Sequence, residues 1–421
     1  MNANAPMSLH QLVSHNRVDD VLAYLTQQVD VDTRDENGST ALMIAVQQNN
    51  LALAKVLIEH GADVNARDVN QLTPYLCAGA NGFHALLSLT LAHGADVTSV
   101  NRFGGTPLLP SSEKGFLRTV QVSLDAGIPV NHANKLGWSA LLEAVILGDG
   151  GYLYADVIEV LLDAGADIHL QDRDGLSALE HAKAQGLQHV VALMTQNEEV
   201  KQGYSTSLRL VKQHIRQFDY QAALIILTGN RHDFANTADY FYYCGYVLTE
   251  LARFEEAIIA YRQGLALSDN KAQFYLYIAN SYRLAKQPKL ALAEFDNGIT
   301  AQPESPFVLY HKSNYLRELG MHEEAVDAMT LLLSQKPHRY DYSFHRANSL
   351  RSLGRHDEAI VAIENAIKHD EYNGLYYQHK VKSLEIIGQL EQAITVIKQA
   401  IEVCDGANEL IEIKNNLLNK S

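Results

Sequence analysis

Three Asn-x-x-Arg pairs recur at 34-residue intervals in the C-terminal half of this 421-residue chain: Asn280 with Arg283, Asn314 with Arg317, and Asn348 with Arg351. A side-chain amide both donates and accepts hydrogen bonds, so it suits the backbone N–H and C=O groups of a peptide of any sequence. A guanidinium is a planar fork that matches a carboxylate. The chemistry predicted by this pattern is the binding of an extended segment that carries acidic side chains or ends in a free carboxylate.

Other side chains keep the same register. Residues three and four apart share a helix face, which places an aromatic residue four positions before each of two of the asparagines. We predict one peptide-binding groove lined by Tyr242, Tyr246, Asn280, Arg283, Tyr310, Asn314, Arg317, Phe344, Asn348, Arg351 and Lys382. The alternative interpretation is a solvated helix face that binds nothing.

No catalytic or metal-binding motif accompanies these residues. The sequence has no Gly-rich phosphate loop, no HExxH and no GxSxG. His311, His345 and His379 share one position but lack partner ligands, so repeat drift explains them better than a metal site. The Gly148–Gly151 cluster lacks a lysine and is read as an insertion loop rather than a nucleotide cradle. We therefore predict a protein that is not an enzyme and has no cofactor and no metal.

The elements that position the pairs are helical hairpins. Alanines recur at unbroken 34-residue spacing, where two helices must approach closely: Ala223, Ala257, Ala291, Ala325, Ala359 and Ala393. This pattern resembles the tetratricopeptide repeat, with about six units over 204–407 and a capping helix at 408–421. The resemblance implies that units stack into a superhelix and that the first helix of each unit lines an inner groove. Asparagine at the position of Asn280, Asn314 and Asn348 is common in this family.

The N-terminal half has a different period. An Asp/Asn-x-x-Gly-x-Thr/Ser motif begins at Asp35, Asp68, Asn101, Asn134 and Asp172, at intervals of 33 residues and finally 38. These residues resemble the ankyrin repeat, over a domain of residues 1–200 with about six repeats, the first degenerate. A glycine-rich insertion at 148–155 resembles a bacterial subgroup of ankyrin proteins. Two features depart from the family: Gln71 stands where glycine is expected, and other residues replace the usual TPLH histidine.

The ankyrin resemblance also implies a second binding surface. Members of the family usually bind through the concave face, formed by the inner helices, and through the hairpin tips. The corresponding candidates here are Asn70, Arg102, Phe103, Lys135, Trp138 and Arg173. Trp138, the single tryptophan, is either an interface anchor or a residue packed on the next hairpin.

Charge and cysteine content narrow the class of partner and the compartment. The net charge is −15, and residues 1–203 hold 23 Asp and Glu against 11 Lys and Arg. Such an acidic half repels phosphate backbones, so we predict no nucleic-acid partner. Three distant cysteines indicate a reducing compartment, and neither a signal peptide nor an apolar run of about 20 residues is present. A cytoplasmic protein without membrane insertion is expected, and homo-oligomerisation is not predicted.

These observations predict an all-α protein of two consecutive helical-repeat solenoids. Residues 198–204 are too few for a flexible tether, so the last ankyrin helix is expected to pack on the first tetratricopeptide unit. The predicted function is a protein–protein interaction scaffold, in which the groove binds a peptide and the ankyrin surface binds a second partner. The alternative is a bacterial immunity or protective protein that neutralises a toxin or stabilises an enzyme by tight binding.

Overall fold

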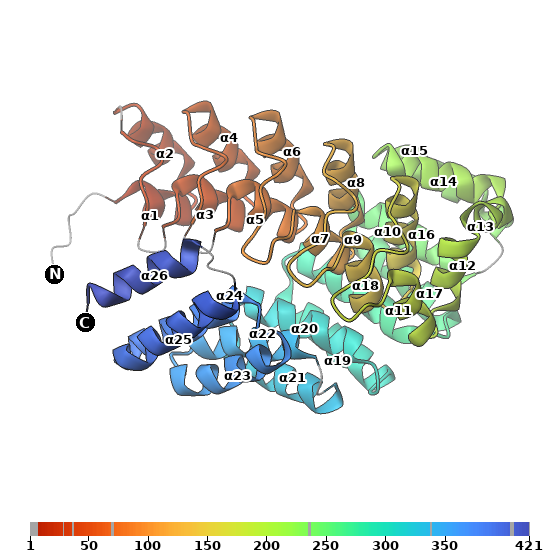
Figure 1. Ribbon diagram of the computed structural model, residues 1–421. Coiled ribbons are helices and arrows are strands. Elements are labelled where there is room, and N and C mark those ends of the chain that lie inside the picture. Colours follow the sequence, from red (N-terminus) through yellow and green to blue (C-terminus); the bar gives the residue numbers. More distant parts are fainter. Residues whose placement is uncertain are drawn as a thin grey trace. The chain divides into compact units, whose positions relative to one another are not determined.

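A computed structural model describes residues 7–27, 29–35, 38–68, 71–234, 237–336, 339–404 and 408–420 (Figure 1). Over these residues the chain is helical and forms no β-strand, only the isolated bridges Ala133 to Ser139 and Gln171 to Ser177. Successive helices pack on one another, which confirms the prediction of an all-α repeat fold. The chain divides into two compact units, Met1–Asp219 (unit 1) and Tyr220–Ser421 (unit 2).

Unit 1 is built of paired short helices. Its helices are α1 (Leu9–Ser14), α2 (Val18–Leu25), α3 (Ala41–Gln47), α4 (Leu51–Glu59), α5 (Pro74–Ala80), α6 (His84–Ala92), α7 (Leu108–Glu113), α8 (Leu117–Asp125), α9 (Ala140–Leu147), α10 (Tyr152–Asp163), α11 (Ala178–Ala184), α12 (Gln188–Thr195), α13 (Asn197–Gly203) and α14 (Thr206–Arg216). The first helices of successive pairs, α1 to α11, pack in one row, and the second helices α4 to α12 pack in another.

The recurring Asp/Asn motif of unit 1 has a local structural cause. In each of its five copies, the side-chain Oδ1 accepts a hydrogen bond from the backbone N–H four residues later, as in Asp35 with Ser39 at 2.8 Å and Asn134 with Trp138 at 3.0 Å. The hydroxyls of Thr40, Thr73 and Ser139 then cap the helices that follow. The motif therefore fixes each hairpin turn and the start of the next helix.

Unit 2 is built of longer helices. They are α15 (Tyr220–Gly229), α16 (Ala238–Glu250), α17 (Phe254–Leu267), α18 (Lys271–Leu284), α19 (Pro288–Ala301), α20 (Pro306–Glu318), α21 (His322–Gln335), α22 (Tyr340–Ser352), α23 (His356–His369), α24 (Gly374–Ile386), α25 (Leu390–Val403) and α26 (Asn408–Leu418), with the 3-10 helix η1 (Arg231–Phe234) after α15. All six 34-spaced alanines are 0% exposed, as the close approach of paired helices requires. The last helix, α26, packs on α25 through Leu410 and Leu417.

The boundary between the two units lies later than the predicted domain limit. The first tetratricopeptide-like unit was expected from residue 204, yet its first helix α14 belongs to unit 1 and its second helix α15 to unit 2. Contacts of α14 with α10, described below, are the physical reason. The domain limits 1–200, 204–407 and 408–421 stay a prediction.

The turn within each long hairpin contains one residue in the left-handed region, at 34-residue spacing. Its φ is 58° at Phe218, 57° at Ala252 and 56° at Lys286, and glycine takes over at 320, 354 and 388. A residue with a Cβ is strained in this region, and glycine is not. Three of the six turns therefore hold strained backbone. At Gln71, in unit 1, a φ of 62° likewise explains why glycine was expected there.

Replacing Lys286 by glycine should therefore stabilise the protein, by about 0.5–1 kcal/mol. Gly320→Ala is the matched control and should destabilise the protein. An added Cβ at position 320 would meet no atom within 4 Å, so any loss of stability comes from the strained backbone and not from a steric clash. Urea unfolding followed by far-UV circular dichroism measures both. A Lys286→Gly variant that is less stable than the wild type would show that the lysine side chain contributes more than the strain costs.

Candidate protein-interaction sites

The six residues of the three Asn-x-x-Arg pairs, which we call the Asn–Arg ladder, lie on the first helices of three successive hairpins: α18, α20 and α22. All six side chains are half-buried. In the second pair the two side chains are bonded to each other: Arg317 Nη2 donates to Asn314 Oδ1 at 2.6 Å. The three pairs thus occupy equivalent positions on the first helices of three consecutive units.

The three arginines of the ladder have different partners. Arg283 Nη1 donates to both carboxylate oxygens of Glu318, at 3.0 and 3.2 Å. Arg317 Nη1 donates to Nδ1 of His345 at 2.9 Å, and Arg351 Nη1 donates to Nδ1 of His379. An imidazole nitrogen that accepts carries no proton, so the two histidines are neutral in this arrangement. Burial of the Arg351 guanidinium lowers its pKa.

These histidines are the residues that sequence analysis missed. Their recurrence was attributed to repeat drift, whereas each lies 28 residues after the arginine that it contacts. An offset of 28 is six less than the repeat length, which places the histidine on the first helix of the following unit. The constant spacing of 28 residues between arginine and histidine was the feature of the sequence that could have predicted these two contacts.

The aromatic residues predicted for the groove are packed inside unit 2. Tyr242, Tyr246, Tyr310 and Phe344 are all buried, and Tyr242 is 0% exposed. The Tyr242 ring lies 5.2 Å from the ring of Tyr277, and the Phe344 ring lies 5.0 Å from that of Tyr376 on the next unit. These four rings fill the space between neighbouring hairpins, so we leave them out of the surface that a ligand would contact.

Lys382 continues the ladder position on α24 and is exposed. Its Nζ lies 3.6 Å from Glu385 Oε2, and Glu385 also accepts from Lys420, which follows α26, at 2.6 Å. Both bonds lower the pKa of the Glu385 carboxyl, that of Lys420 most. The last unit therefore places a carboxylate where the preceding three units place a guanidinium.

The hairpin tips of unit 1 form a second candidate surface. Backbone hydrogen bonds join successive tips, from Lys135 N to Phe103 O at 2.9 Å and from Arg173 N to Leu136 O at 3.3 Å. Arg102 lies over the Phe103 ring, 5.2 Å from its centroid. Lys135 and Arg173 are exposed, whereas Arg102, Phe103 and Trp138 are half-buried. The sixth candidate, Asn70, lies outside the described residues.

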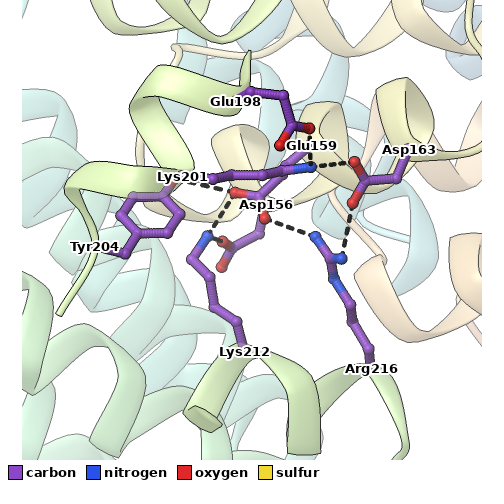
Figure 2. A network of polar contacts seen from close by, with 8 residues as sticks. All are labelled: Asp156, Glu159, Asp163, Glu198, Lys201, Tyr204, Lys212 and Arg216. Carbon is purple, nitrogen blue, oxygen red and sulfur yellow. Dashed lines mark hydrogen bonds and ion pairs between the residues drawn. The ribbon is translucent and has the colours of Figure 1, made fainter. Parts of the chain in front are cut away.

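A charged network joins α10 to the segment that follows the ankyrin-like repeats, all within unit 1 (Figure 2). Three acidic residues of α10, Asp156, Glu159 and Asp163, lie on one helix face. Lys212 Nζ contacts Asp156 at 2.6 Å and Glu159 at 2.9 Å, and Arg216 contacts Glu159 at 2.6 Å and Asp163 at 2.7 Å. The Tyr204 hydroxyl donates to Glu159 at 3.0 Å, and Lys201 pairs with Asp163.

The centre of this network is buried. The side chains of Glu159 and Lys212 are 3% and 11% exposed, and Leu208, Val211 and Ile215 of α14 are also buried. The helix that sequence analysis assigned to the first tetratricopeptide unit is thus joined to α10 by ion pairs. The expected partner was the last ankyrin helix, α12; these ion pairs are made with α10 instead.

The side chain of Glu143 on α9 is buried, and the pKa of its carboxyl is raised well above the usual range. Burial is the main cause and the charge of Glu113 the second. Its Oε1 accepts from Asn134 Nδ2 at 3.0 Å. A raised pKa means that the folded state holds the proton more tightly than the unfolded state. Stability from this group is therefore full at low pH and is lost as pH rises through the raised value.

Replacing Glu143 by glutamine should stabilise unit 1 at pH 8, by about 1–3 kcal/mol, because the amide keeps an oxygen for Asn134 and needs no proton. The difference from wild type should shrink toward zero as the pH falls and the glutamate becomes protonated. Urea unfolding followed by Trp138 fluorescence, at several pH values, measures it. A difference that does not change with pH would contradict the assignment.

A pocket away from the ladder is a further candidate site in the described residues. An open pocket of about 540 Å³ lies between the turns after α16 and α18, lined by Arg253, Glu256, Leu284 and Lys286 among others, and it contains no ladder residue. Among the described residues no three His, Cys, Asp or Glu side chains are grouped as metal ligands. A search of the same residues finds no helix with the length and apolar character needed to cross a bilayer.

Comparison with known families agrees with the repeat pattern. The family model of ankyrin repeats (3 copies) matches residues 9–101 and 75–172, and the tetratricopeptide repeat model matches residues 340–373. A putative ankyrin repeat protein of Escherichia coli strain K12, YahD, is 39% identical over 54 residues, which are 13% of this chain and 27% of YahD. The chain thus matches about a quarter of that relative's length.

Two solved structures are each similar to a little under half of this chain. An ankyrin repeat domain of Acinetobacter baumannii AYE, ABAYE2397, is 47% identical, covering 44% of this chain and 95% of that one, with a TM-score of 0.44. The ankyrin repeat protein EF0377 is 34% identical, covering 45% of this chain and 96% of that one, with a TM-score of 0.44. Repeats of both kinds indicate a protein–protein interaction scaffold. By these matches the chain carries ankyrin repeats within residues 9–172 and a tetratricopeptide repeat at residues 340–373.

Proposed function

We propose that this protein is a non-enzymatic scaffold whose unit 2 binds an extended acidic or C-terminal segment of a partner protein along the Asn–Arg ladder. The observation that carries the proposal is the recurrence of one Asn-x-x-Arg pair on α18, α20 and α22, with every side chain half-buried. Half-buried amides and guanidiniums keep their geometry while still facing a ligand. Three identical rungs also match the repeating backbone of an extended peptide.

The ankyrin-like half is proposed to bind a second surface. Three successive hairpin tips carry a cation at the same position, Arg102, Lys135 and Arg173, although this half of the chain is acidic overall. Phe103 and Trp138 add aromatic contact area beside them. We propose that the tips and the concave face of this half act as a separate binding surface in a cytoplasmic protein.

Affinity capture with the tagged full-length protein in lysate of its native cells tests the ladder proposal. After washing, the column is eluted first with hexaglutamate and then with hexalysine, and each eluate is analysed by mass spectrometry. We expect one or a few proteins that leave with hexaglutamate, because it competes for the arginines. Proteins that leave only with hexalysine, or none retained at all, would contradict binding through the ladder.

A further inference from the structure

The open pocket between the turns after α16 and α18 is separate from the Asn–Arg ladder. Its wall consists of residues 252–256 and 284–287, which belong to two successive hairpins of unit 2. Its volume is about 540 Å³. Pockets that bind small molecules usually have volumes of about 300–1,000 Å³. The size of this pocket is therefore that of a site for a small ligand.

Both turns that form the pocket have strained backbone. Ala252 has a φ of 57° and Lys286 a φ of 56°, although each residue has a Cβ. The turns of three later hairpins have glycine at this position, which avoids the strain. Strained residues of this kind cluster at active sites and ligand clamps. The lysine at position 286 therefore calls for a use of its side chain that glycine could not supply.

An equivalent turn shows such a use within the chain itself. Phe218 has a φ of 58°, and its ring lies 5.2 Å from the guanidinium of Arg118, also in unit 1. Lys286 differs, because its side chain is exposed and forms no hydrogen bond or ion pair with any described residue. No such contact within the described chain offsets the strain at this turn. The lysine does, however, place a cation on the wall of the pocket.

The same wall carries a carboxylate and an apolar surface. Arg253 donates from Nε and Nη2 to the two carboxylate oxygens of Glu256, at 2.7 and 2.6 Å, so these two residues neutralise each other. The neighbouring Glu255 is exposed and has no bonded partner among the described residues. Leu284, which is 47% exposed, and Phe254 supply apolar surface. A ligand in this pocket thus meets charges of both signs beside apolar side chains.

We propose that this pocket binds a small zwitterion with an apolar side chain, which is the chemistry of a free amino acid or a dipeptide. The carboxylate of the ligand pairs with Lys286, its ammonium pairs with Glu255, and its side chain lies against Leu284. Glutamate and lysine side chains on hairpins whose helices lie about 8–10 Å apart are long enough to reach the two ends of such a ligand. A ligand with a single charge would leave one of the two wall charges without a partner. This inference does not depend on the proposed function.

Saturation-transfer difference NMR on the full-length protein tests this class of ligand with four probes. L-leucine and the dipeptide Leu-Leu carry both charges, and they separate the two sources of the zwitterion. Isocaproic acid has the carboxylate and the apolar chain of leucine without the ammonium, and isoamylamine has the ammonium without the carboxylate. We expect leucine, Leu-Leu or both to bind with a Kd below about 1 mM. Both single-charge probes should bind about tenfold more weakly, or weaker still.

Two substitutions of Lys286 separate recognition from folding. Lys286→Gly removes the cation and the strain together, so the zwitterion should bind about tenfold more weakly while the protein becomes more stable. Lys286→Gln removes the charge but keeps the strained backbone, and it should weaken binding equally. Glu255→Gln should also weaken binding about tenfold, through the ammonium. Lys289→Gln is the matched control, since Lys289 is exposed on α19 outside the wall of the pocket, and it should not change the affinity.

Three results would overturn the inference. If isocaproic acid binds as tightly as leucine, the ammonium is not recognised and the ligand is not a zwitterion. If both Lys286 variants bind the zwitterion as the wild type does, any binding occurs elsewhere on the chain. If none of the four probes binds, the pocket is not a site for this class of ligand. The proposed peptide function stands or fails separately, because all ladder residues are unchanged in these variants.

Discussion

Replacing Glu159 by alanine should destabilise unit 1 by about 3 kcal/mol, because it removes the buried carboxylate that Tyr204, Lys212 and Arg216 share. Glu159 accepts from Tyr204, Lys212 and Arg216 at 3.0, 2.9 and 2.6 Å, and its own side chain is 3% exposed. Urea unfolding followed by fluorescence measures the effect. Trp138 is the only tryptophan of the chain and lies in unit 1, so its signal reports this unit.

Asp163→Ala is the matched control for this loss. Asp163 lies on the same face of α10 and pairs with Lys201 and Arg216, but its side chain is 29% exposed. Water replaces much of what that substitution removes, so a loss of at most about 1 kcal/mol is expected. Similar small losses for both variants would mean that the apolar side chains of α14 hold it on α10 and that the buried charges contribute little.

Reversing the charge of all three ladder arginines to glutamate should reduce capture of the native partner more than 100-fold. The substitution removes three guanidiniums, and it puts three carboxylates where an acidic segment would lie. Loss of two charge-assisted hydrogen bonds alone accounts for about 3 kcal/mol, and like-charge repulsion adds to it. Quantitative mass spectrometry of the captured partner gives the ratio.

The same number of charges reversed elsewhere in unit 2 provides the control. Lys271, Lys289 and Lys368 are exposed lysines outside the ladder, and their reversal to glutamate changes the net charge of the protein by the same amount. Capture should then fall by no more than about threefold, the effect of the overall field at physiological salt. Equal losses for the two triple variants would mean that net charge, and not the ladder, governs binding.

The repeat architecture could be predicted from the sequence because close packing leaves few choices. Where two helices approach closely, only a small side chain fits, so Ala223, Ala325 and Ala393 return at multiples of one fixed interval and are all 0% exposed. The 33-residue motif in unit 1 carries comparable information, since its Asp or Asn bonds to the backbone four residues on. Both requirements are local, so the same residue types recur in every repeat and can be recognised from the sequence.

The lining of the binding face was harder to predict. Helical spacing places Phe344 and Asn348 on one face, but the structure buries the first and half-buries the second. The first helix of each hairpin packs against the hairpins before and after it. Some residues on its inner face are therefore buried between hairpins, while others on the same face remain partly exposed to solvent. Sequence periodicity alone cannot locate that division, and for this reason the predicted aromatic lining became part of the core.

The charged network of unit 1 was missed for another reason. Asp156, Glu159 and Asp163 have i, i+3, i+7 spacing, and Lys212 and Arg216 have i, i+4 spacing, so complementary faces were visible in the sequence. The register of the tetratricopeptide repeat assigned α14 to the second half, and the acidic helix was assigned to the first. Side-chain complementarity over more than 50 residues is seen only once the helices are placed.

Site-specific photo-crosslinking tests most directly whether partners bind on the Asn–Arg ladder. A benzophenone amino acid is placed at Asn348 in one variant and in another at Ile259, which is 60% exposed on α17, a second helix of its hairpin. After irradiation in native lysate, we predict a partner adduct from position 348 and none from position 259. An adduct from position 259 with none from 348 would contradict the account, because the partner would then contact a different face of unit 2.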